Sequence, residues 1–175
     1  MREKRLNQSI TKAPRTAPKP KLFKRRDPEY VRRFEIAAKT AKWAVTMTQV
    51  RIRQAIADNP WPHWHPLSFT GRDGRESRGV VDLIAVRKDH GEPPRGTRRG
   101  DALQIILIQV KGGSAANPTA EDAARLHIIR RRHGACCILL ATWKKGSAAQ
   151  FFSLNTNSKS DSKWRDVEDL RSVFA

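Results

Sequence analysis

The spacing of apolar residues predicts a long helical segment near the start of the chain. Residues 30–58 contain no proline or glycine. Apolar residues recur there at helical spacing, at Tyr30, Phe34, Ala37, Ala41, Val45, Ile52 and Ile56. Asp27-Pro28-Glu29 is typical of a helix start, with an aspartate as N-cap and a proline in the first turn. The segment is either one helix or two with a break near residues 46–48, and the proline-rich stretch 59–66 ends it.

Shorter apolar runs follow and predict strands. They are residues 67–70, 80–86, 103–110, 135–143 and 150–154. The run 103–110 is almost wholly apolar, as expected of a strand covered on both faces. Pro118-Thr119 begins a helix that continues to about His133, where Gly134 stops it. Strand, strand, helix and strand with covered sheet faces predict an α/β layer fold.

The charge of the chain predicts a polyanionic partner. The 175 residues suggest one domain with appendages. Lysine and arginine number 35 against 17 acidic residues, a net charge of +18, and neutralisation of phosphates with release of counterions is the obvious physics. No apolar run is long enough to span a bilayer, and no signal peptide opens the chain, so we expect nucleic acid, most simply DNA, and no membrane.

Residues 1–26 differ from the rest in composition. Their basic residues, Arg25 and Arg26 among them, are opposed by Glu3 alone, and three prolines break any helix. We interpret them as a disordered basic arm that could lie along phosphates, with a solubilising tail as the alternative. Residues 27–175 then form the folded domain, with a helical segment at about 28–58, a core at about 64–155 and a tail with a short helix.

The cysteines and histidines carry a weaker signal. Cys136 and Cys137 are adjacent inside an apolar run, which is typical of small buried hydrophobic residues in a reducing compartment, and this indicates the cytoplasm. His63 and His65, flanked by tryptophans, could be metal ligands or a base-stacking platform. We favour an aromatic plug under the sheet.

Polar residues inside two apolar strands are the main candidates for chemistry. Asp82 interrupts the run 80–86, and Gln109 and Lys111 close the run that begins at Ile105. Because residues i and i+2 of a strand point to the same face, Gln109 and Lys111 should project together. Buried charges must find partners, so Asp82 beside Lys111 is either a structural ion pair or a metal site. The oxygen ligands would be the Asp82 carboxylate, the Gln109 side-chain carbonyl and the Val110 backbone carbonyl.

Residues 81–85 (Val-Asp-Leu-Ile-Ala) and 108–112 (Ile-Gln-Val-Lys-Gly) resemble the signature of the PD-(D/E)XK nuclease superfamily. That signature is an Asp on one strand and (E/Q)-x-K on the next. The following helix, Gly134 and the strand 138–141 look like the continuation seen in archaeal Holliday-junction resolvases and related endonucleases. The resemblance covers about residues 45–155. It implies a restriction-endonuclease-like core, a central mixed β-sheet flanked by helices.

The resemblance also implies an activity, a Mg²⁺- or Mn²⁺-dependent DNA endonuclease, with branched DNA as one possible substrate. Asp82 would bind the metal, Gln109 would stand where glutamate is commoner, and Lys111 would orient or help to activate the attacking water. Two-strand cutters in this superfamily commonly dimerise, so a homodimer is one possible assembly, although the sequence does not fix the oligomer.

The chain departs from the family pattern in ways that keep alternatives open. Val81 replaces a proline, and Gln109 removes one negative charge, which should lower metal affinity. These nucleases often add a glutamate from the first core helix, but that position falls near Gln49. Glu35 in a different helical register, or Glu76 in a loop, could serve instead. A catalytically weak or inactive nucleic-acid-binding protein, or a basic structural protein, are the alternatives.

Seven arginines are candidate DNA contacts: Arg25, Arg26, Arg98, Arg99, Arg130, Arg131 and Arg132. The last three most simply complement the C-terminus of their helix, which is compatible with phosphate contact. Arg98 and Arg99, on a long loop, are ordinary solvated charges unless that loop closes over a substrate.

Overall fold

The computed structural model describes residues 27–58, 63–69, 79–113, 117–154 and 163–175. The elements are α1 (Pro28–Ala57), β1 (His65–Ser68), β2 (Leu83–Lys88), β3 (Leu103–Gly112), α2 (Ala120–His133), β4 (Cys137–Trp143), β5 (Gln150–Leu154), β6 (Trp164–Asp166) and α3 (Leu170–Val173). The predicted arm, with Arg25 and Arg26, and the candidate Glu76 lie outside the described residues. Among described residues, no helix is long and apolar enough to cross a membrane.

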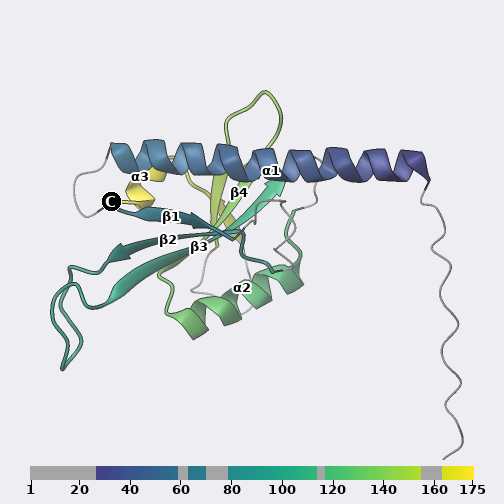
Figure 1. Ribbon diagram of the computed structural model, residues 1–175. Helices are drawn as coiled ribbons and strands as arrows, with labels where there is room; N and C mark the ends of the chain where they lie inside the picture. The colour runs from purple at the N-terminus through teal and green to yellow at the C-terminus, as the bar shows by residue number, and fades with distance from the viewer. Residues whose placement is uncertain (1–26, 59–62, 70–78, 114–116, 155–162) are drawn as a thin grey trace, which may run out of the picture.

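One mixed sheet organises the domain. Its strands follow the chain order from β1 to β6, and β3 pairs with β4 in parallel, whereas every other neighbouring pair is antiparallel. The helix α2 makes the crossover from β3 to β4, and α1 lies across the opposite face (Figure 1). This arrangement confirms the predicted α/β fold, a mixed sheet flanked by helices.

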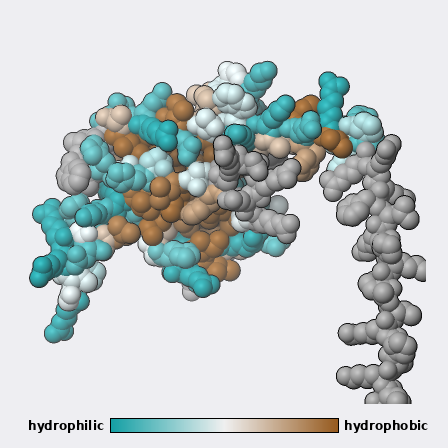
Figure 2. Space-filling view, in the orientation of Figure 1, coloured by the Kyte–Doolittle hydropathy of each residue, from teal (hydrophilic) through white to brown (hydrophobic). Residues whose placement is uncertain are grey.

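The sheet is apolar on both faces. Along β3, Ile106 and Ile108 join the cluster under α1, and Leu107 joins the cluster that faces α2. This alternation explains why residues 103–110 are almost wholly apolar. In the space-filling view, apolar side chains gather between the two helices, and hydrophilic ones cover the β2–β3 connection (Figure 2).

The helix α1 is continuous, so the alternative of a break near residues 46–48 is wrong. The Asp27 carboxylate caps its start by accepting the Glu29 N–H at 2.9 Å, as predicted. The Thr46 hydroxyl donates to the Lys42 carbonyl at 3.0 Å, so this polar side chain is satisfied without leaving the helix. The C-terminal half packs on the sheet, and the N-terminal part projects past it and leaves Tyr30 exposed (Figure 1).

Two glycines let α1 approach the end of β3. A Cβ on Gly112 would lie 2.7 Å from the Ala44 Cβ, and one on Gly113 would lie 2.9 Å from the Thr40 Cγ2. Gly113 also has a φ of +66°, which residues with a Cβ rarely adopt. The small residues at this crossing fix where the helix lies relative to the end of the strand.

The helix α2 has the predicted start and stop. Thr119 and Asp122 form a capping box, and Gly134 ends the helix in the left-handed conformation with a φ of 61°. The Arg130 guanidinium donates to the carbonyls of Ala135 and Cys136, at 2.9 and 3.2 Å. It therefore fastens the turn that leads into β4.

The cysteines are less buried than predicted. Cys136 is exposed and Cys137 is half-buried, and both are free thiols. The reason is that the buried part of this strand begins one residue later, at Ile138. Partial burial still raises the pKa of Cys137 to about 11.

The aromatic plug is present in part. Trp64 is buried, with its ring edge-to-face on Phe174 at 5.8 Å and the Arg87 guanidinium 4.5 Å from its centroid. His63 and His65 are exposed, and residue 61 lies outside the described residues.

Candidate active site

Asp82 is held at the start of β2 by three contacts. Its N–H donates to the Ile108 carbonyl at 3.0 Å, and its carbonyl accepts the Phe69 N–H at 3.0 Å. Its carboxylate Oδ2 accepts the Val110 N–H at 2.7 Å. Asp82 therefore contacts β3 on both sides of Gln109, as expected for neighbouring strands.

Gln109 is the most unusual polar residue of the sheet. It is 4% exposed, and its Oε1 is buried without a hydrogen-bond partner among the described residues. Alternation along β3 puts its side chain on the face of Leu107, toward α2. Leaving a buried acceptor unsatisfied costs about 1–3 kcal/mol, so this oxygen is a candidate ligand for a cation or an ordered water.

The Val110 carbonyl lies on the same edge of β3 as Asp82. In a β-ladder, the N–H and C=O of one residue point to the same neighbouring strand, and the Val110 N–H points to the Asp82 carboxylate. The predicted oxygen ligands thus come from adjacent positions, and their chemistry fits a hard cation such as Mg²⁺. Only the Asp82 carboxylate brings a negative charge.

Lys111 has a carboxylate partner that the sequence did not suggest. Its Nζ lies 4.0 Å from Oδ2 of Asp122, in the first turn of α2. The same oxygen accepts the Thr119 N–H at 3.4 Å in the capping box, so Asp122 links the helix start to the lysine. Convergence of Asp82 and Lys111 stays a prediction, because the ion pair that Lys111 forms here is with Asp122.

Lys111 also lines a cavity of about 650 Å³ beside α1. Its walls are Arg33, Ile36, Ala37, Thr40 and Ala41 from the helix and residues 110–113 from the end of β3. Arg33, which pairs with Glu29, and Lys111 are the two charged residues of this lining. The volume is in the range of small-ligand sites, and an anion such as a phosphate could bind these two cations only in competition with their carboxylate partners, Glu29 and Asp122.

The proposed helix carboxylate does not reach this site. Glu35 is exposed, and it precedes Ala44 by nine residues, about two and a half turns, so it lies on the side of α1 away from the sheet. Across the described segments, no three His, Cys, Asp or Glu side chains form a group that could hold a metal ion. The candidate His63 and His65 belong to no such group.

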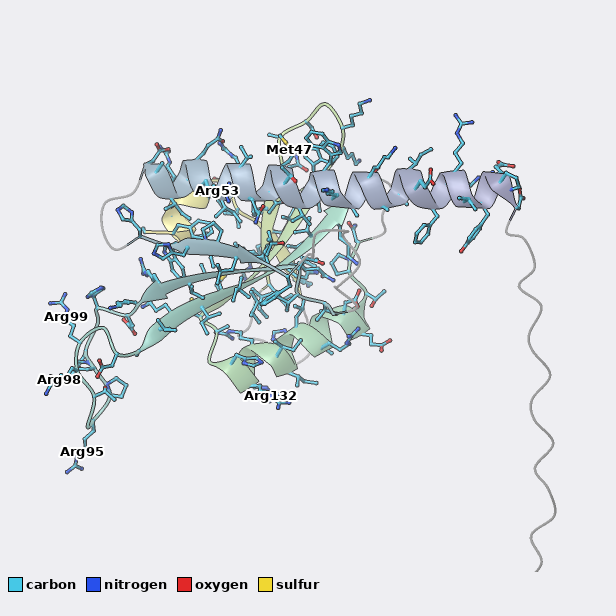
Figure 3. The ribbon with its side chains drawn as sticks, in the orientation of Figure 1. Met47, Arg53, Arg95, Arg98, Arg99 and Arg132 are labelled. Carbon is cyan, nitrogen blue, oxygen red and sulfur yellow. The ribbon has the colours of Figure 1, made fainter. Side chains whose placement is uncertain are left out.

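The predicted basic residues lie away from this pocket. Arg98 and Arg99 are exposed on the β2–β3 connection, between the sheet and the tip that carries Arg95, and Arg132 is on the last turn of α2 (Figure 3). Internal contacts hold this part of the connection, since the Arg99 Nε donates to the His90 carbonyl and the Arg98 N–H to the Asp101 carboxylate, both at 2.8 Å. Arg131 is also exposed, whereas Arg130 has the structural contacts described above.

No family model and no curated protein sequence matches this chain. Among solved structures it is similar to Hjc, a Holliday junction resolvase from the archaeal hyperthermophile Archaeoglobus fulgidus. The two chains are 16% identical, and the match covers 76% of this chain and 90% of that one, with a TM-score of 0.39. The likeness is coarse and concerns the course of the chain.

Proposed function

We propose that this chain is a divalent-metal-dependent endonuclease that hydrolyses phosphodiester bonds in DNA at a site formed by Asp82, Gln109 and Lys111. The observation that carries the proposal is that an anchored carboxylate and a buried amide oxygen without a hydrogen-bond partner come from neighbouring positions of adjacent strands. The Asp82 carboxylate is fixed on the Val110 N–H, and the neighbouring Gln109 Oε1 has no partner among the described residues. The net charge of +18 supports a nucleic acid as substrate.

Each residue has a distinct role in this proposal. The Asp82 carboxylate, the Gln109 Oε1 and the Val110 carbonyl would hold Mg²⁺ or Mn²⁺, and the bound ion would supply Lewis-acid stabilisation of charge on the phosphate. The Lys111 ammonium would donate to a phosphate oxygen and stabilise the negative charge that develops when water attacks the phosphorus. Asp122 would keep that ammonium in position.

Cleavage of branched, duplex and single-stranded DNA with Mg²⁺ or Mn²⁺ tests the proposal. Asp82→Ala and Lys111→Ala should each abolish cleavage and leave DNA binding nearly unchanged, because affinity comes from many other basic residues. Lys88→Ala is the matched control, since this exposed lysine lies at the other end of β2. Cleavage that survives both site variants would contradict the assignment.

A second candidate is a nuclease-fold DNA-binding protein that cuts weakly or not at all. It is favoured by the donor set, in which Asp82 is the one acid, and by the lack of an acidic cluster among the described residues. It predicts tight binding to all three DNA forms with weak or no cleavage at every concentration of either metal.

We further propose that Arg98, Arg99, Arg131, Arg132 and the arm of residues 1–26 contact phosphates. The arm would add affinity without specificity, because dense charge alone reads no bases. Its deletion should flatten the salt dependence of binding by about one unit of slope for each phosphate that the arm neutralises, and an unchanged slope would show that the arm is idle. We also propose a cytoplasmic protein that acts as a homodimer where both strands are cut.

A further inference from the structure

A second hollow lies next to the Lys111 cavity, where α1 passes the end of β4. It has a volume of about 640 Å³. Its lining residues are Ile36, Lys39, Thr40, Trp43, Met47, Gly113, Trp143 and Lys145. We call it the tryptophan pocket. The β4–β5 connection, which carries Lys145, rises beside α1 and forms one of its walls (Figure 1).

The tryptophan pocket adjoins the cavity that Lys111 lines beside α1. Ile36, Thr40 and Gly113 line both hollows. The two hollows share a wall at this crossing, where the Thr40 side chain lies close to Gly113. A polymer bound at Lys111 could therefore extend into the tryptophan pocket.

The chemistry of the pocket suits a flat aromatic group attached to an anion. Trp43 is 57% exposed, so its ring is accessible for stacking by a ligand. Trp143 contributes a second indole from the end of β4, and the exposed Lys39 and Lys145 add positive charge. Indoles and ammonium groups together are what single nucleic-acid strands meet in their binding grooves, where bases stack on aromatic rings and phosphates pair with cations.

We propose that the tryptophan pocket receives one unpaired base of the DNA strand whose backbone lies at Lys111, with Trp43 as the stacking surface. This inference rests on the proposed function, since it needs DNA at that lysine. A base inside a duplex is stacked and paired, so only a base already displaced, as at a bulge, flap or branch, enters without the cost of unstacking. The pocket would thus select DNA by structure and not by sequence.

Binding without divalent metal tests the pocket apart from cleavage. We would compare a fully paired duplex with one that carries a single unpaired 2-aminopurine, a fluorescent base whose emission falls when it stacks. The protein should bind the second duplex about tenfold more tightly, as expected for one base stacked on an aromatic ring, and should quench its emission.

Variants at two matched positions decide the role of Trp43. Trp43→Leu keeps an apolar side chain but removes the ring, so it should lose both the preference and the quenching, and Trp43→Phe should keep them. Phe34→Leu is the control, because Phe34 is on the same helix, is 56% exposed and lines neither hollow. Equal binding of the two duplexes by the unaltered protein, or a preference that survives Trp43→Leu, would overturn the pocket.

The two proposals fail differently. If the protein cuts DNA but shows no preference for the unpaired base, the base-binding role of the pocket is refuted and the nuclease proposal stands. If the protein prefers the unpaired base but never cuts DNA, the nuclease proposal is refuted and the pocket stands as a binding site. A protein that binds neither duplex loses both, and a protein partner then becomes the occupant to seek.

Discussion

The Gln109→Glu variant distinguishes a metal site at Asp82 and Gln109 from a purely structural arrangement of these residues. The change introduces a carboxylate at a position that is 4% exposed and whose oxygen has no partner among the described residues. Without a cation, an uncompensated buried charge should lower the free energy of unfolding by about 3–5 kcal/mol. With a cation, the second carboxylate should tighten binding, and Mg²⁺ at about 100 times its dissociation constant would restore about 2.7 kcal/mol.

Urea unfolding with and without Mg²⁺, together with calorimetric titration of the metal, measures both quantities. Gln109→Met is the control, because it has a similar volume and replaces the unpartnered oxygen with an apolar atom. It should be neutral or stabilising in the absence of metal. A Gln109→Glu protein that is destabilised, is not stabilised by Mg²⁺ and binds Mg²⁺ no more tightly would refute the metal site and, with it, the proposed nuclease activity.

Three further predictions concern the fold and its basic surface. Gly112→Ala should cost about 1–3 kcal/mol in urea unfolding because its Cβ would lie 2.7 Å from a side chain of α1, whereas Gly79→Ala, with nothing nearer than 3.8 Å, should cost little. Burial raises the pKa of Cys137 from 9.0 to about 11, so the stability that its neutral thiol contributes is complete below pH 9 and should fall by about 3 kcal/mol as pH rises through about 11. Cys137→Ala should flatten the curve of stability against pH over that window. Arg130→Ala should lower the thermal midpoint because it removes two hydrogen bonds, whereas the exposed Arg132→Ala should leave the midpoint unchanged and weaken DNA binding.

The helices and central strands were predictable because their signals are local. The proline at the start of α1, the capping box of α2 and the apolar run of β3 each determine structure within one element. The first strand begins two residues earlier than predicted, because its sequence includes Pro66, a residue typical of turns. Pro66 is tolerated because β1 is an edge strand, where a missing N–H need not break the ladder.

The site was predictable only in part, because half of it depends on relations between elements. The spacing of Gln109 and Lys111 sets their shared face within one strand. From the sequence, Asp122 can be recognised as part of a helix cap. Its position near Lys111 depends on the parallel crossover from β3 to β4, which the sequence does not indicate. The orientation of Glu35 depends on which stripe of α1 the sheet buries, which a helix apolar on more than one side does not reveal.

The β2–β3 hairpin sets a fixed separation between the candidate active site and the connection that carries Arg98 and Arg99. Asp82 and Gln109 lie at one end of a ladder whose register runs from Leu83 opposite Ile108 to Lys88 opposite Leu103. Five steps of about 3.3 Å make this ladder about 17 Å long, which equals about five nucleotide steps of 3.4 Å along DNA, and the connection of residues 89–102 that carries the arginines extends beyond it. The hairpin would then act as a molecular spacer. Two extra residues in each strand would keep every side chain on its face and move Arg98 and Arg99 about two nucleotides further from the proposed cleavage site.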